Sequence, residues 1–285
     1  MACNCRTPPD PSTSKRTSMK MIALFPLLAC AVSPLVANAA DADASGFRLF
    51  GHQTELSLGA AAVAAPRYFG SRDDRVQFAP VLAAQSGLLF FDSVRGLGAQ
   101  FQSDGGFYVS QSFGYDLGRL DRNSNWRPGS RTLAGMGDVP GSITSRSMIA
   151  QQFTSYLMLD AEAEFALKDG ARRNNYRAGA KFTLLQNDRD TLTMNLDAHW
   201  GDRRYNQAYF GVTDAQSARS GFAAYSAGSG LYAYSVGANW DHALSKHWST
   251  SLTVAGTRYV DNADGSPIVQ RRAFASAIGA VTYTF

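Results

Sequence analysis

The feature that most constrains the fold is an alternation of apolar and polar residues in segments of about ten residues. In segment 191–200 the even positions are Leu, Met, Leu, Ala and Trp, whereas the odd positions are Thr, Thr, Asn, Asp and His. Segments 230–241 and 247–257 divide in the same way. A period of two residues is typical of β-strands with one apolar face, and about ten tilted strand residues cross a membrane. The pattern therefore predicts an all-β protein.

Loop lengths indicate which way the apolar faces point. A soluble β-sandwich would turn them inward. Here every second connection is short, and the long ones, 66–74, 118–141, 201–228 and 259–271, share the opposite parity. Outer-membrane barrels have this arrangement, with short periplasmic turns and long extracellular loops. The expected strands are 53–65, 75–86, 88–94, 96–103, 106–117, 142–152, 155–167, 174–186, 190–200, 229–241, 246–258 and 272–285.

These segments predict a transmembrane antiparallel up-and-down β-barrel of twelve strands, with apolar side chains toward lipid and polar ones toward a lumen. An even number of strands places both termini in the periplasm. The strand count depends on whether the chain turns at 85–88, so barrels of ten or fourteen strands are the alternatives. Aromatic residues at strand ends, Trp200, Trp240 and Trp248, fit the interfacial girdle of such a barrel.

The chain stops on an aromatic residue. Odd positions from 273 to 285 form an unbroken apolar row that ends in Tyr283 and Phe285. Because the last strand of a barrel pairs with the first, the chain can end within the wall. Tyr283 and Phe285 also resemble the terminal signal that the barrel-assembly machinery reads, so this machinery is an expected partner.

The N-terminal segment has the features of a secretory signal peptide. Lys20 precedes an apolar run at 21–29, and Ala37-Asn38-Ala39 matches a cleavage site. We predict a signal peptide with an upstream extension over 1–39, a short periplasmic segment at 40–52 and the barrel at 53–285. Translation starts at Met1 or Met19, and a lipobox-like stretch before Cys30 leaves lipidation there open.

Charge and cysteine content exclude several classes of function. The net charge is +4, but Arg6, Lys15, Arg16 and Lys20 against Asp10 give the leader +3, which leaves +1 for the other residues. No basic patch for nucleic acid follows from this balance. All three cysteines precede residue 40. Thiol catalysis, cysteine-bound zinc and disulfides are therefore excluded after that point, and no cofactor is expected.

Short motifs in residues 55–285 resemble, in order, those of the MltA-interacting protein (MipA)/OmpV family of outer-membrane proteins. The matching segments are Pro66–Ser71, Leu133–Val139, Tyr209–Val212, Ala218–Gly221 and Asp264–Ile268. The loop residues that the resemblance singles out are Tyr68, Gly70, Ser71, Tyr209, Gly211, Ser220, Gly221, Ser266 and Pro267. Phe285 fits the family as well.

The resemblance implies a non-enzymatic barrel. For the family's namesake it implies a scaffold that links a lytic transglycosylase to a bifunctional peptidoglycan synthase. We predict the same role for this chain, with the docking surface on the short turns, at residues such as Asp188 and Lys246, or on Asp41–Gly46. Two alternatives stay open, a small-solute channel and a surface adhesin or antigen of the OmpV type.

One hairpin carries a pattern of complementary charges. Asp160, Glu162 and Glu164 share one face of the strand at 155–167, and Arg177 and Lys181 share one face of the next strand. A four-residue loop at 169–172 would place Glu164 beside Arg177 and Asp160 beside Lys181. Such pairs stabilise by about 0.2–1 kcal/mol each, whereas an arginine at the lipid midplane would cost about 2–4 kcal/mol. We therefore predict that these charges face the lumen, either as packing or as a selectivity filter.

Asp197 and His199 lie two apart on one strand face, about 7 Å from each other. No nucleophile elbow or second carboxylate pair accompanies them. We interpret them as a polar pair that fills the lumen, not as catalytic residues, and predict no enzyme. The four histidines, at 52, 199, 242 and 247, have no metal-binding spacing.

The long loop 118–141 combines basic and aromatic residues. It contains Arg119, Arg122, Arg127 and Arg131 together with Trp126. Guanidinium groups recognise phosphate well, so this loop is a candidate surface for lipopolysaccharide. An ordinary solvated loop is the alternative.

Overall fold

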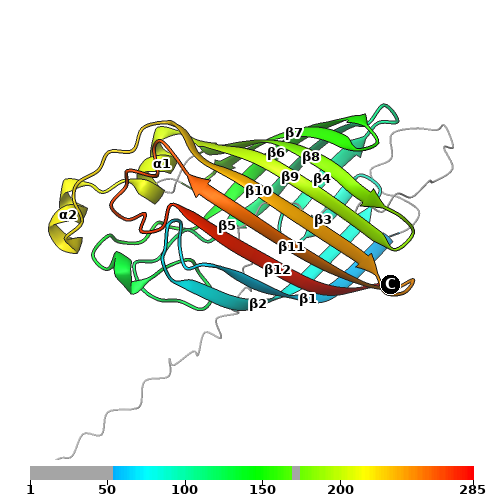
Figure 1. Cartoon of the computed structure of the whole chain (residues 1–285), viewed down its shortest axis with the longest axis horizontal. Helices are drawn as coiled ribbons and strands as arrows, with labels where there is room; N and C mark the ends of the chain where they lie inside the picture. Colours follow the sequence, from blue (N-terminus) through cyan, green and yellow to red (C-terminus); the bar gives the residue numbers. More distant parts are fainter. Residues whose placement is uncertain (1–53, 169–173) are drawn as a thin grey trace, which may run out of the picture.

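The computed structural model describes residues 54–168 and 174–285. The predicted signal peptide, its cleavage site, Cys30 and the segment 40–52 lie outside these residues. Within the described part of the chain, twelve antiparallel strands form one closed barrel (Figure 1). The prediction of a twelve-stranded up-and-down barrel is confirmed.

The strands follow the predicted segments closely, with ends that differ by one or two residues in most cases. They are β1 (Thr54–Pro66), β2 (Asp74–Ser86), β3 (Leu89–Asp92), β4 (Gly96–Gln102), β5 (Phe107–Asp116), β6 (Ser142–Thr154), β7 (Leu157–Ala166), β8 (Asn174–Gln186), β9 (Asp190–Gly201), β10 (Gly230–Ala243), β11 (Trp248–Tyr259) and β12 (Ala273–Thr284). Closure pairs β1 with β12 from Ser57↔Thr284 to Ala64↔Ala277. The chain does end within the wall.

The two ends of the barrel differ in the length of their connections. We call the end with the connections 67–73, 117–141, 202–229 and 260–272 the loop end, and the other the turn end. In Figure 1 the loop end lies on the left and the C-terminus lies at the turn end on the right. Two short helices, α1 (Arg203–Phe210) and α2 (Asp214–Ser220), lie in the connection after β9. In residues 54–168 and 174–285 no helix is long and apolar enough to span a membrane.

Both helices begin at residues that cap a helix N-terminus. Asp202 accepts a hydrogen bond from the Tyr205 backbone N–H at the start of α1, and Thr213 forms a capping box with Gln216 at the start of α2. Such caps satisfy the free N–H groups of a first turn. Gly221 ends α2 with a φ of 76°, which a residue without a Cβ adopts easily.

The outer face of the barrel is apolar, as the alternation predicts. Val236, Leu252 and Val254 are 44–48% exposed on that face. In β12 the odd positions point outward, with Val281 44% exposed, while Ser276 on the inner face is buried. Apolar side chains toward lipid and a lined lumen are the arrangement of a membrane barrel, and this chain has it.

One aromatic residue departs from the predicted face. The alternation placed Tyr232 outward with Tyr234, but Tyr232 is 8% exposed and points inward. The pairing of β10 with β9 shifts between Leu231 and Ala233. A bulge of this kind inserts one residue, and the parity of the strand changes across it.

Candidate functional site

The charges of β6, β7, β8 and β9 gather on the lumen face as one network. We call this group, with Lys181 and His199, the charged sector. Its ion-paired side chains are only 4–12% exposed: Arg146, Asp160, Glu162, Glu164, Arg177 and Asp197. Buried charges of this kind are tolerated when they are paired and hydrogen-bonded.

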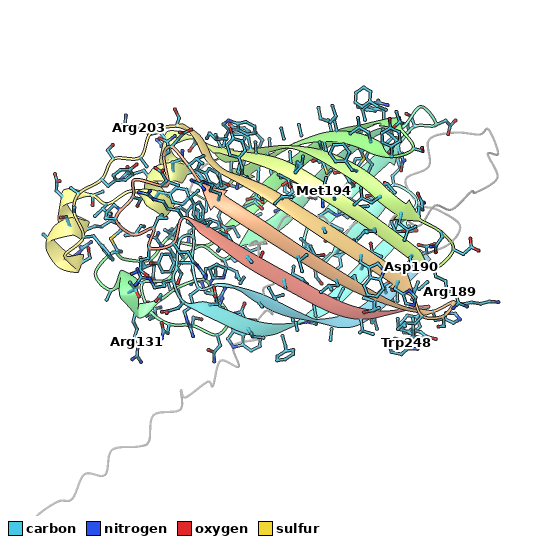
Figure 2. The ribbon with its side chains drawn as sticks, viewed as in Figure 1. Arg131, Arg189, Asp190, Met194, Arg203 and Trp248 are labelled. Atoms are coloured by element: carbon cyan, nitrogen blue, oxygen red, sulfur yellow. The ribbon has the colours of Figure 1, made fainter. Side chains whose placement is uncertain are left out.

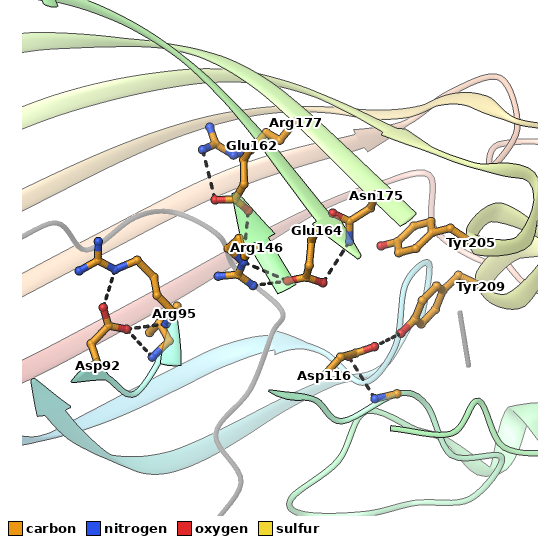
Figure 3. Close-up of polar contacts among 12 residues, drawn as sticks. Asp92, Arg95, Asp116, Arg146, Glu162, Glu164, Asn175, Arg177, Tyr205 and Tyr209 are labelled. Atoms are coloured by element: carbon orange, nitrogen blue, oxygen red, sulfur yellow. Dashed lines mark hydrogen bonds and ion pairs between the residues drawn. The ribbon is translucent and has the colours of Figure 1, made fainter. Parts of the chain in front are cut away.

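Arg177 of β8 is the centre of the network. Its guanidinium lies 2.5 Å from Asp160 of β7 and donates a 2.7 Å hydrogen bond to Asp197 of β9. Glu162 lies 3.8 Å away (Figure 3). One cation therefore ties three adjacent strands together through two short contacts and one longer one.

A glycine makes room for this guanidinium. Gly179 pairs with Asp160 on one side and with Asp197 on the other. A Cβ on Gly179 would meet the Asp197 carboxylate, the Arg177 Nη1 atom and the Asp160 carboxylate. The missing side chain lets Arg177 reach across its own strand to both acids. Gly179 was not predicted from the sequence, because a glycine within a strand carries no charge pattern.

Arg146 of β6 extends the network on its other side. It donates from Nε and Nη2 to Glu164, with the Nε bond 3.0 Å long, and lies 3.5 Å from Glu162. Asn175 also donates to Glu164 at 3.4 Å (Figure 3). Arg146 was not predicted as a site residue, although it is an isolated charge at an inward-facing position of its strand. A bulge between Gln152 and Thr154 shifts its register with β7.

The predicted pairing of β7 with β8 is wrong by two residues. Arg177 pairs with Glu162 and not with Glu164, and Asp160 pairs with Gly179 and not with Lys181, which lies opposite Met158. The connection between these strands spans 167–173, so it is longer than the four residues assumed. A slip of two residues leaves every side chain on its face, and all five charges still point inward.

Asp197 and His199 lie on the same face but do not bond each other directly. Ser235 of β10 joins them: its Oγ lies 2.9 Å from His199 Nε2 and donates to Asp197 over 3.5 Å. Asp197 makes its shorter contact with Arg177. In the described ranges no group of three or more potential metal-ligating side chains comes together.

Four long connections fold into the loop end and form what we call the cap. An aromatic cluster lies at its base, where Phe210 has no exposed surface and Tyr259 is 2% exposed. The ring of Phe69 lies 5.1 Å from that of Tyr209, centroid to centroid. The other rings of the cluster are Tyr205, Tyr225, Tyr232 and Phe274. Between the cap and the charged sector there is a cavity of about 140 Å³.

Loop residues singled out by their motifs hold the cap together. Tyr68 donates to the Ile268 carbonyl at 3.0 Å, and Ser266 donates to the Phe210 carbonyl at 2.5 Å. The Gly70 carbonyl accepts from the backbone N–H groups of Gln270 and Arg271. Gly70 has a φ of 86°, and a Cβ there would meet Val269. These contacts join connections that are about 200 residues apart.

The remaining motif residues act within single connections or join the cap to the wall. Tyr209 donates to Asp116 of β5 at 3.1 Å (Figure 3). Ser220 donates to the Gln216 carbonyl, Gly211 ends α1 and Gly221 ends α2. Pro267 follows Ser266 in the turn before the buried Ile268.

The arginines expected on the surface of loop 118–141 do not all lie there. Arg119 is 1% exposed and donates to the Tyr209 carbonyl at 3.0 Å inside the cap. Burial lowers the pKa of Arg119 and raises the pKa of the neighbouring Tyr68 to about 12, because each loses water around its charged form. Arg127 donates to the Leu117 carbonyl. Arg122, Arg131 and Trp126 are exposed.

The lumen wall across from the charged sector has a different character. We call it the small-residue sector, on β12, β1 and β2, half the circumference away in the closed strand order. Ala280 pairs with Ala61, which pairs with Ala79, all on the inner face. Gly59, Val63, Val81 and Ile278 complete the sector. At these seven positions the inner face is apolar like the outer face, which alternation does not predict, whereas Arg75, Gln77 and Ser276 elsewhere on the same inner face are polar.

Comparison with known proteins identifies a family. The family model described as MltA-interacting protein MipA matches residues 58–285. An outer membrane channel from Pseudomonas putida F1 is similar in structure, with a TM-score of 0.48 and 8% identity, over 86% of this chain and 99% of that one. The NanC porin has a TM-score of 0.42 and 8% identity, over 80% and 98% of the two chains. At these values neither structure indicates what this chain binds or transports. No curated protein sequence matches it.

Proposed function

Because the chain belongs to the MltA-interacting protein MipA family, we propose that this outer-membrane barrel is a non-catalytic scaffold for peptidoglycan-remodelling enzymes. Its partner is a lytic transglycosylase, the kind of enzyme that the family name points to. We place the turn end, with both ends of the barrel chain, in the periplasm, where short turns are usual.

The observation that carries this proposal is the cap. Its residues Phe210, Ala227, Ala263 and Ile268 have no exposed surface, and its hydrogen bonds join the four long connections to one another. A cap with a buried apolar interior across the loop end does not favour passage of solutes. The turn end, in contrast, presents exposed side chains to the compartment that contains peptidoglycan.

Two neighbouring turns provide a docking surface. The turn 187–189 follows β8 and the turn 244–247 follows β10. Asp190 lies 2.8 Å from His242 and accepts from the Trp240 indole at 2.9 Å, which fixes the two turns beside each other. Asp188, Arg189, Leu244 and Lys246 are exposed around them, and Figure 2 shows Arg189 at this end of the barrel.

Photo-crosslinking in living Gram-negative cells tests the proposal. A crosslinking residue at Asp188 or Lys246 is expected to capture a lytic transglycosylase, identified by mass spectrometry. The matched controls are Arg131 and Arg203, which are also exposed but lie at the loop end (Figure 2). Capture of the transglycosylase from Arg131 or Arg203 alone would contradict the orientation and the docking surface.

Planar bilayer recording is a second, independent test. A barrel closed by its cap is expected to show no steady conductance. A pore-sized, ion-selective current from the purified protein would favour a small-solute channel instead.

A further inference from the structure

The outer wall of the barrel carries a groove just below the loop end. It has a volume of about 850 Å³ and crosses β7 to β12. Small residues form its floor, and Leu159, Leu196 and Val236 rise beside them. The floor residues are Ala178, Ala180, Ala198, Gly256 and Ala273. Two rows that follow the strand register define it, one through Ala180, Leu196, Val236 and Gly256 and the other through Ala178, Ala198, Tyr234 and Arg258.

A single cation lies at the edge of this groove. Arg258 is on the outer face of β11, opposite Tyr234 of β10 and Ala273 of β12, and it is exposed. Within residues 54–168 and 174–285, no ion pair or side-chain hydrogen bond involves Arg258. The other outward residues between Trp248 and Arg258 are uncharged: Thr250, Leu252, Val254 and Gly256.

The height of Arg258 in the wall can be calculated. Trp248 and Arg258 are both on the outer face, ten residues apart on the same strand. Ten residues rise about 34 Å along a strand, and a tilt of about 45° reduces this to about 24 Å along the membrane normal. The apolar band of a membrane barrel is about 25 Å tall. With Trp248 at one interface, Arg258 lies at the headgroup level of the opposite leaflet.

We propose that this groove binds the lipid A part of lipopolysaccharide, with a lipid A phosphate on Arg258 and an acyl chain along the small-residue floor. A guanidinium pairs with phosphate through two parallel hydrogen bonds. The floor offers the chain a path over alanine and glycine, bordered by the side chains of Leu196, Tyr234 and Val236. This proposal shares with the scaffold proposal the orientation that puts the loop end in the outer leaflet. It does not depend on any enzyme partner.

Native mass spectrometry of the detergent-purified, delipidated protein tests this site. The probes are lipid A and, separately, dioleoyl phosphatidylglycerol. Arg258→Gln is expected to weaken lipid A binding about ten-fold, the loss of a charge-assisted contact. Arg203→Gln removes another exposed arginine, on α1, and is expected to leave lipid A binding unchanged.

Filling the groove gives a second comparison. A Cβ on Gly256 would meet only Val236 at 3.9 Å, and a Cβ on Gly279, also on the outer face, would meet nothing within 4 Å. Both Gly256→Leu and Gly279→Leu are therefore expected to fold. Gly256→Leu should reduce lipid A binding several-fold, and Gly279→Leu should not.

Three outcomes would overturn the proposal. These are equal affinities of Arg258→Gln and Arg203→Gln, equal affinities of the two leucine variants, and wild-type protein that binds phosphatidylglycerol as tightly as lipid A. The last outcome would make Arg258 a general contact for anionic lipid. None of them affects the crosslinking at Asp188 and Lys246, so failure of this site and failure of the scaffold role are distinguishable.

Discussion

The charged sector and the small-residue sector line the same lumen, but they are stabilised in opposite ways. In the charged sector each acid finds an arginine on a neighbouring strand, so the wall depends on partners that are present. In the small-residue sector Ala61, Ala79 and Ala280 lie side by side, so the packing of this wall depends on side chains that stay small. Removing a group should therefore damage the first sector, and adding one should damage the second.

The largest effect is expected from Arg177→Met. This change leaves Asp160, Asp197 and Glu162 close together without the cation that lies between them. Breaking a buried ion pair by removing one partner costs about 3–5 kcal/mol. The free energy of unfolding, measured by urea titration in lipid vesicles with tryptophan fluorescence, should fall by this amount. A loss below about 1 kcal/mol, typical of surface ion pairs, would show that the sector is solvated.

An intermediate effect is expected from Gly59→Ala at the closing seam. A Cβ on Gly59 would meet the Val281 backbone oxygen and the Thr282 side chain of β12. Backbone cannot move without disturbing the β1–β12 pairing, and overpacking typically costs about 1–3 kcal/mol. The control is Gly279→Ala, which should stay within about 0.5 kcal/mol of wild type. Equal unfolding midpoints for the two variants would refute the close packing of this sector.

The smallest effect is expected from Gly179→Ala, the same change made in the charged sector. The added Cβ would meet the ends of the Asp197, Arg177 and Asp160 side chains, and these can shift where backbone cannot. We expect a loss of about 1 kcal/mol, near the centre of the distribution for point mutants. If Gly179→Ala proves more damaging than Gly59→Ala, the network is the more rigid of the two sectors.

Alternation and loop parity predicted most of the wall. They placed the strands, the outward faces of β9, β11 and β12, and the inward faces of the charges from Asp160 to Lys181. Side-chain period and loop length are local properties, and one strand is enough to read them. The same reasoning misjudged Tyr232, because the bulge in β10 reverses parity without any marker in the sequence.

The candidate site was less predictable than the wall that holds it. The sequence identified Asp160, Glu162, Glu164 and Arg177. It did not identify Arg146 or Gly179. The predicted pairing of the charges differs from the observed one by two residues. Motif resemblance singled out Tyr68, Tyr209 and Ser266 without indicating that they meet. In the structure they hold one cap through contacts with Ile268, Asp116 and Phe210.

The sequence by itself favoured twelve strands, placed the outer faces of β9, β11 and β12, and put the charges from Asp160 to Lys181 on the lumen side. A shift of two residues in the pairing of two strands keeps every side chain on its face. Alternation therefore does not determine which acid pairs with which arginine. Only the tertiary structure decided the pairing around Arg177, the inward turn of Tyr232 and the assembly of the cap. Those features depend on bulges, on the length of connections and on contacts between distant loops, which no local pattern encodes.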